Sequence, residues 1–83
     1  MKKQINNKMW HYTKDEDYPI VFGKYENTLY PQIPCLVDIT NCCCDILFWN
    51  VKECYWNDEY DDYSFNKDEV ERWIYLDDLT KMK

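Results

Sequence analysis

Two apolar segments that flank a turn signal constrain the fold of this chain more than any other feature. Residues 35–39 read Cys-Leu-Val-Asp-Ile, and residues 42–49 read Cys-Cys-Cys-Asp-Ile-Leu-Phe-Trp. Thr40 and Asn41 lie between them, and Asn tolerates the positive φ that tight hairpin loops require. We therefore predict an antiparallel β-hairpin in which Thr40 and Asn41 form a two-residue loop.

The length of this loop determines which side chains share a face of the hairpin. A two-residue loop pairs residue 39 with 42, 37 with 44 and 35 with 46. It predicts a wholly apolar inner face made of Cys35, Val37, Ile39, Cys42, Cys44, Ile46 and Phe48. A slip of one residue would bring Asp38 and Asp45 into the core, so we expect that register to be disfavoured.

Further strands are expected on both sides of the hairpin. Residues 50–53 can turn the chain into a third strand at residues 54–57, and residues 73–76 have the aromatic and β-branched composition of another. Residues 19–23 can form an edge strand. Asn66 and Glu69 have the spacing of a helix N-cap. The predicted fold is therefore mainly β with minor α, a small antiparallel β-meander of about four strands with at most one or two short helical turns.

The length of 83 residues allows one hydrophobic core. Residues 1–9 are polar, so we expect a frayed N-terminus followed by a single domain over residues 10–83. Lys2 and Lys3 precede no apolar segment of the kind a signal peptide needs, and the longest apolar run, residues 46–49, is too short to cross a membrane. An odd number of cysteines, five, is also typical of a reducing compartment. We therefore expect a cytoplasmic protein with no membrane partner.

Acidic residues are concentrated in the second half of the chain. The net charge is −6, and residues 45–83 carry all of the excess, with eleven acidic and five basic side chains. A protein that binds a phosphate backbone needs a basic stripe. The charge pattern therefore argues against direct binding of nucleic acid.

The cysteine pattern does not match that of a common metal site. Zinc sites usually combine two Cys pairs, or a Cys pair with a His pair, whereas this chain has no second Cys pair and His11 is its only histidine. We expect the cysteines to be small buried apolar residues, and we predict no metal and no cofactor. The alternative is a metal- or thiol-dependent module that uses Cys35, Cys42 and Cys44, with Cys54 or His11.

Catalytic chemistry is not indicated either. The carboxylates occur in runs, at residues 15–17, 58–59, 61–62 and 77–78, which is typical of solvated loops rather than of an acid–base pair. Ser64, the only serine, lacks the context of a nucleophile elbow, and Gly23 is the only glycine, so no glycine-rich phosphate loop is present. We predict that the protein is not an enzyme and has no catalytic residues.

Aromatic residues cluster around the acidic loop that follows the third predicted strand, which is the composition of a protein-binding surface. The residues predicted to bind are Trp56, Asp58, Glu59, Tyr60, Asp61 and Asp62. The leading hypothesis is a non-enzymatic domain that binds a host protein. A second alternative is a DNA mimic that inhibits a nucleic-acid-binding protein of the host. An unpaired edge at residues 19–23 or 73–76 could also pair two copies into a homodimer.

The order of these motifs resembles the domain-of-unknown-function family numbered 551, whose members are small proteins common in phages and prophages. The resemblance spans about residues 9–79, and its matching positions are Trp10, Pro19, Val37, Trp56, Val70, Trp73 and Leu76. Tyr18 replaces the usual Leu before Pro19, residues 23–34 form a longer link than usual, and Asp77 replaces the closing Pro. The resemblance implies a compact sheet and a phage-linked bacterial setting, and no assigned activity.

Overall fold

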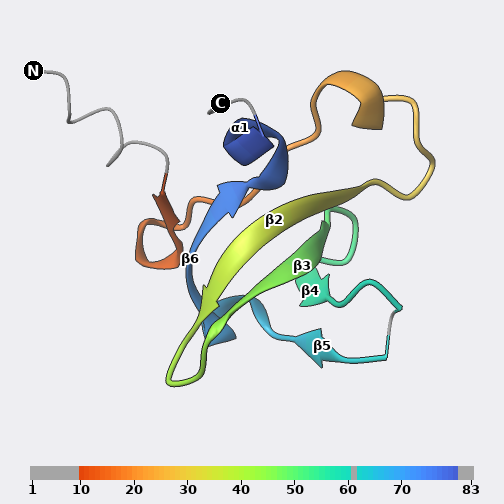
Figure 1. The fold of residues 1–83 in the computed structure, drawn as a ribbon. Coiled ribbons are helices and arrows are strands. Elements are labelled where there is room, and N and C mark those ends of the chain that lie inside the picture. Colours follow the sequence, from red (N-terminus) through yellow and green to blue (C-terminus); the bar gives the residue numbers. More distant parts are fainter. Residues whose placement is uncertain (1–9, 61, 81–83) are drawn as a thin grey trace, which may run out of the picture.

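The computed structural model describes residues 10–60 and 62–80, which form one twisted antiparallel sheet (Figure 1). The strands are β1 (His11–Tyr12), β2 (Gln32–Ile39), β3 (Cys44–Asn50), β4 (Tyr55–Asn57), β5 (Ser64–Phe65) and β6 (Val70–Tyr75). Helix α1 (Leu76–Thr80) follows β6, and single 3-10 turns occupy Thr13–Asp15, Gly23–Tyr25 and Lys67–Glu69. The mainly β class is confirmed, although the described sheet has six strands rather than four.

The strand order is β1-β6-β2-β3-β4-β5, and every neighbouring pair is antiparallel. Strands β2, β3 and β4 form the predicted meander, β5 extends it, and β6 then returns to the free side of β2. The prediction of an unpaired edge at residues 73–76 is wrong, because β6 lies between β1 and β2 and Leu76 already begins α1. Residues 19–23 contain no strand, so the predicted edge strand there is wrong as well. The edges of the described sheet are β1 and β5, which are only two residues long.

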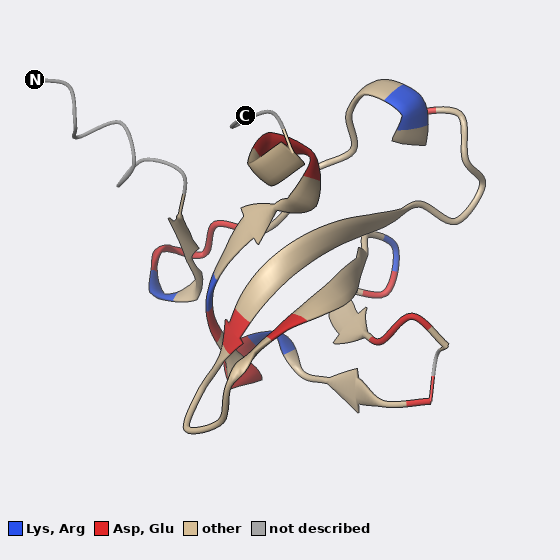
Figure 2. Cartoon of the chain, viewed as in Figure 1, with Lys and Arg blue, Asp and Glu red and all other residues tan. Residues whose placement is uncertain are grey.

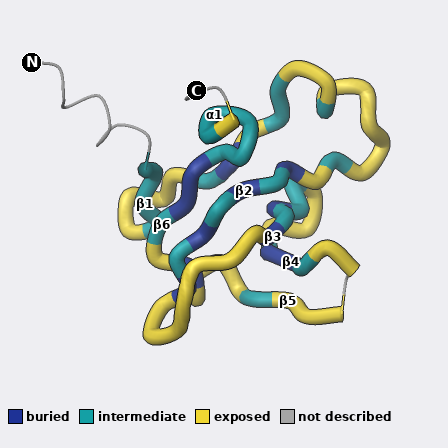
Figure 3. The backbone as a smooth tube through the Cα atoms, in the orientation of Figure 1, coloured by how far each residue is buried: buried dark blue, intermediate teal, exposed yellow. Residues whose placement is uncertain are grey.

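The core lies on one face of this sheet. Its buried residues come from the central strands: Ile33, Cys35, Val37, Ile39, Leu47, Trp49, Trp56, Val70 and Trp73. Figure 3 shows that burial follows the central strands, whereas the hairpin tip and the loops around the sheet are exposed. Tyr18, Phe22 and Tyr25, from the segment between β1 and β2, pack against this core. One sheet face is therefore closed by a layer of aromatic side chains rather than by a second sheet.

The hairpin is confirmed, but its predicted register is wrong by one residue. Residue 35 pairs with Leu47 rather than with Ile46. Residue 33 pairs with Trp49, and residue 37 pairs with Asp45. Leu47 and Trp49 therefore point into the core at 1% and 3% exposure, whereas Ile46 is 37% exposed on the other face. The expected penalty for burying Asp45 does not arise, because Asp45 lies near the hairpin tip, where the side chain is exposed.

The turn shows how the backbone accommodates the altered register. Asn41 has the predicted positive φ, 60°, and Cys42 N donates to Ile39 O across the turn. Ile39 N donates in the other direction to Cys43 O, one residue beyond Cys42. Two residues, 42 and 43, therefore stand opposite Ile39, which is the arrangement of a β-bulge. This extra residue shifts every later residue of β3 to the face opposite the one predicted.

The turn before β6 forms as predicted from its capping residues. Asn66 and Glu69 form a capping box around the single 3-10 turn, and Asn66 N donates to the Glu69 carboxylate at 2.7 Å. Val70 follows in extended conformation and begins β6. The box therefore ends the β4–β5 hairpin region and directs the chain back across the sheet to pair with β2.

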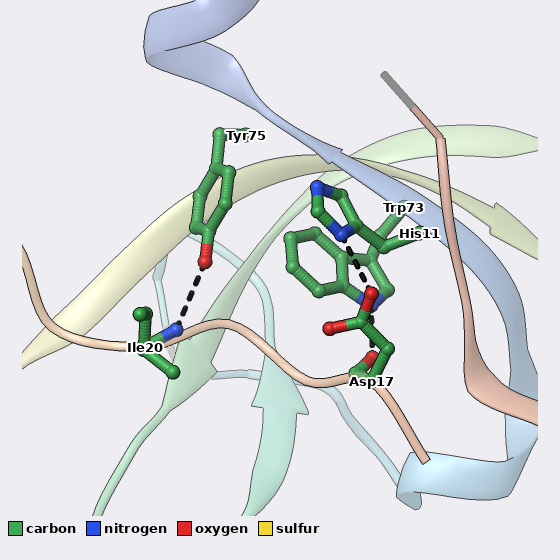
Figure 4. Close-up of polar contacts among 5 residues, drawn as sticks. All are labelled: His11, Asp17, Ile20, Trp73 and Tyr75. Atoms are coloured by element: carbon green, nitrogen blue, oxygen red, sulfur yellow. Dashed lines mark hydrogen bonds and ion pairs between the residues drawn. The ribbon is translucent and has the colours of Figure 1, made fainter. Parts of the chain in front are cut away.

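Hydrogen bonds and a stacked ring pair hold β1 and the chain after it against β6 (Figure 4). The His11 ring stacks on the Trp73 ring with centroids 4.1 Å apart, and His11 Nδ1 lies 2.7 Å from Asp17 Oδ2. Trp73 Nε1 donates to Asp17 O at 2.8 Å, and Ile20 N donates to the Tyr75 hydroxyl at 3.0 Å. These contacts position residues 17–20 over the core, so β1 and the following loop close the sheet through side chains more than through strand pairing.

Candidate interaction surface

The face of the sheet opposite the core carries a row of apolar side chains. Leu36 pairs with Ile46 on one side and with Ile74 on the other, so the three residues share this outer face. Phe48 lies two residues further along β3 on the same face and is partly exposed. The segment between β1 and β2 packs against the other face. Ile74 is 4% exposed and therefore covered, whereas Leu36, Ile46 and Phe48 form an apolar strip that the described chain leaves partly uncovered.

The acidic loop after β4 is organised by one of its own carboxylates. Asp58 Oδ1 accepts hydrogen bonds from Asp62 N at 2.7 Å and from Tyr63 N at 3.1 Å, and Asp58 N donates to Tyr63 O at 3.0 Å. These bonds close the loop at its base and leave Glu59 and Tyr60 exposed, with Tyr60 at 75%. Asp58 therefore shapes the loop, while Glu59 and Tyr60 are presented to solvent.

The strip and the loop meet in a concave region of about 560 Å³. We call this region the acidic–apolar surface, and it is lined by Asp45, Ile46, Phe48, Asp58, Glu59, Tyr60 and Leu76. Figure 2 shows acidic residues on the β4–β5 loop and at the start of β3. The surface thus combines an apolar floor with three carboxylates, and its volume lies within the range typical of ligand pockets.

The carboxylates of this surface have no cationic partner in the described part of the chain. Asp45, Asp58 and Glu59 form no ion pair with a described residue, whereas Asp38 and Asp77 are each paired with a basic side chain. Asp38 accepts from Arg72 Nε at 3.1 Å. The negative charge around Ile46 and Phe48 is therefore available to an external cation.

A second concavity of about 280 Å³ adjoins the first and shares Phe48, Asp58 and Glu59 with it. Its wall is fixed by Asn57, which is 3% exposed and donates from Nδ2 to Gln32 Oε1 at 2.9 Å. This bond ties β4 to the start of β2 beneath the acidic loop. The acidic–apolar surface is therefore built on strands of the sheet as well as on the loop.

The structure brings together only part of the predicted binding set. Asp58, Glu59 and Tyr60 lie on the acidic–apolar surface, and Asp62 is exposed nearby. Trp56 is 0% exposed in the core, so it cannot act as a surface anchor. Asp61 lies outside the described residues. Trp56 was misjudged because its neighbours in the sequence are polar, whereas its strand partner is the buried Trp49.

Four lining residues were missed by sequence reasoning: Asp45, Ile46, Phe48 and Leu76. The predicted register had placed Ile46 and Phe48 in the core, and the one-residue bulge turns them outward. Their alternation with Leu47 and Trp49 was the available signal. Both sets are apolar, however, so the alternation alone could not say which set faces outward.

The cysteines divide into one buried and four exposed residues. Cys35 is 0% exposed, as predicted, and burial raises the pKa of its thiol, with a smaller effect from the charges of Asp77 and Asp78. The prediction of buried thiols is wrong for the others, Cys42, Cys43, Cys44 and Cys54. The set Cys35, Cys42, Cys44 with Cys54 or His11 does not assemble, since the described residues contain no group of three or more His, Cys, Asp or Glu side chains placed to hold a metal ion.

No family model, no curated protein and no solved structure matches this chain. Among the described residues, no helix has the length and apolar character needed to cross a membrane.

Proposed function

We propose that this protein is a non-enzymatic interaction domain that binds a basic, partly apolar segment of another protein on its acidic–apolar surface. The observation that carries the proposal is the concavity in which Ile46, Phe48 and Leu76 lie beside Asp45, Asp58 and Glu59. Apolar side chains with a charged rim are typical of specific protein interfaces. The carboxylates attract a cationic partner, and the apolar floor retains it.

The mixture of side chains favours binding of a peptide-like segment over the action of a DNA mimic. A DNA mimic would present carboxylates in a continuous row that imitates phosphates. On this surface, the three acidic residues share the lining with the apolar side chains of Ile46, Phe48 and Leu76. A segment with Lys or Arg next to an aliphatic or aromatic residue would satisfy both kinds of group.

The setting that we propose for this function is the cytoplasm of a bacterial cell, with a host protein as partner. Five cysteines without a disulfide support a reducing compartment. The phage-linked setting depends on the resemblance to family 551 and stays a prediction. The acidic–apolar surface does not depend on it.

The test is a selection of peptides from a random displayed library on the immobilised, reduced protein. We expect enriched peptides to combine basic with apolar residues. Binding kinetics of one enriched peptide are then measured for Glu59→Gln and Phe48→Ala. The first change removes a rim charge and should slow association at low salt, with a smaller effect at high salt. The second removes part of the apolar floor and should mainly speed dissociation.

Matched controls come from an exposed loop elsewhere in the chain. Glu26→Gln removes one carboxylate, and Leu29→Ala removes an apolar side chain that is 79% exposed. Both controls should bind like the original protein. Enrichment of peptides without basic residues, or equal binding by the surface variants and the controls, would overturn the proposal.

A further inference from the structure

The tip of the β2–β3 hairpin presents two thiols in contact. Cys42 Sγ and Cys43 Sγ lie 3.5 Å apart, and both side chains are exposed. The bulge holds the backbone at this point, because Cys42 N and Cys43 O both bond to Ile39. The two sulfurs are therefore presented side by side by a fixed turn rather than by a loose loop.

Backbone geometry disfavours a direct disulfide between these neighbours. Consecutive Cα atoms are about 3.8 Å apart, whereas the Cα atoms of disulfide-bonded residues are usually about 4.4–6.8 Å apart. A bond between Cys42 and Cys43 would be strained and easily reduced. An atom that bridges the sulfurs avoids this strain, because the sulfurs can then stay near their present separation.

A tetrahedral thiophilic cation fits that separation. Zinc–thiolate bonds of about 2.3 Å at the tetrahedral angle place two sulfurs about 3.8 Å apart. The sulfurs of Cys42 and Cys43 would need to separate by only a few tenths of an ångström from 3.5 Å. We propose that Cys42 and Cys43 form a two-sulfur chelate for a thiophilic divalent cation of the zinc class, whose remaining positions are taken by water or by a small external thiol.

The local charge suits a cation. Asp45, two residues after Cys43 in the sequence, has an exposed side chain near the hairpin tip. A nearby carboxylate opposes a free thiolate and favours a bound cation.

The experiment uses Cd²⁺ as the probe, because its ultraviolet sulfur-to-metal absorption reports thiolate ligands directly. The whole chain, reduced with a phosphine, is titrated with Cd²⁺ at pH 7.5, and the single variants Cys42→Ser and Cys43→Ser are titrated in parallel. Loss of an outer-shell partner alone weakens metal binding by about 10–100-fold, so loss of a direct ligand should cost more than about 100-fold. Both positions are exposed, and unfolding curves of the variants verify that they fold.

Two matched controls separate a chelate from general thiol affinity. Cys44→Ser removes the next exposed cysteine along the chain, and Cys54→Ser removes one at the turn before β4. Binding that is retained in both controls and lost in both test variants supports the two-sulfur site. A comparable loss in Cys44→Ser would overturn the assignment in favour of a three-sulfur site. A loss in Cys54→Ser, or unchanged binding in Cys42→Ser or Cys43→Ser, would also overturn it. Failure of this site would leave the acidic–apolar surface unaffected.

Discussion

Truncation of two neighbouring residues on β3 tests the register of the central hairpin. Leu47 is 1% exposed among the core side chains, whereas Ile46, the residue before it, is 37% exposed on the opposite face. Truncation of a buried Leu to Ala costs about 2–5 kcal/mol, because it removes apolar contacts and leaves a cavity. Truncation of a partly exposed Ile in a strand costs about 1 kcal/mol. We therefore expect Leu47→Ala to destabilise the protein by at least about 1–2 kcal/mol more than Ile46→Ala.

The assay is equilibrium unfolding in urea under reducing conditions, followed by tryptophan fluorescence. A cost of about 3 kcal/mol with a slope of about 1.5 kcal/mol per molar moves the midpoint by about 2 M. A domain of this length has a total stability of about 4–12 kcal/mol, so at the lower end of that range Leu47→Ala would be close to unfolding.

The opposite register predicts the opposite result. With a two-residue loop, Ile46 would be buried and Leu47 would lie on the outer face, so the two costs would exchange. Equal costs for the two variants, or a larger cost for Ile46→Ala, would refute the register and with it the acidic–apolar surface. An unfolded Leu47→Ala beside a folded Ile46→Ala would support it.

Three further predictions concern side chains that lie in the core or pack against it. Trp73 and Trp56 are both 0% exposed, but Trp73 Nε1 donates to a backbone carbonyl, whereas Trp56 Nε1 has no partner among the described residues. Replacement of Trp73 with Phe should therefore cost about 1 kcal/mol more than replacement of Trp56 with Phe in the same urea assay, and equal costs would contradict this. In a thiol titration of the native protein, the four exposed cysteines should react rapidly and Cys35 only on unfolding. The reason is that Cys35 is buried and the pKa of its thiol is raised. Equal reaction rates for all five cysteines would count against the fold. Burial and a hydrogen bond to Asp77 raise the pKa of Tyr25 from 10.0 to about 12, so the stability from this neutral hydroxyl is present below pH 10 and is lost as the pH rises toward 12. The urea midpoint of Tyr25→Phe should therefore fall less between pH 10 and 11 than that of the original protein; an identical fall would refute the assignment.

Local chemistry accounts for the features that sequence reasoning predicted correctly. Asn41 adopts the positive φ that its position before the cysteines indicated, and Asn66 with Glu69 forms the expected capping box. Both depend on contacts within a few residues, and such contacts are encoded in short stretches of sequence. The third strand, now β4 at Tyr55–Asn57, follows from the same kind of local signal.

The candidate site was predictable only in part, for reasons of packing. The acidic loop with Glu59 and Tyr60 was apparent from composition, because carboxylates in a run are seldom buried. Its partners Ile46 and Phe48 were not, because they lie on β3 and meet the loop only through the sheet. Trp56 was assigned to the surface from its acidic neighbours, whereas contact with Trp49, Trp73 and the rest of the core buries it.

The sequence by itself determined that this chain forms an antiparallel β domain with a turn at Asn41 and an acidic loop after the third predicted strand, because alternation, turn residues and charge act over short distances. Only the tertiary structure decided which face of β3 became the interior and which cysteines stayed in solvent. Residues 46–49 are apolar on both faces, so the pattern was equally consistent with two registers. The choice depends on packing against Trp73 of β6, Trp56 of β4 and the aromatic segment around Tyr18, which are distant in sequence and come together only in the folded sheet.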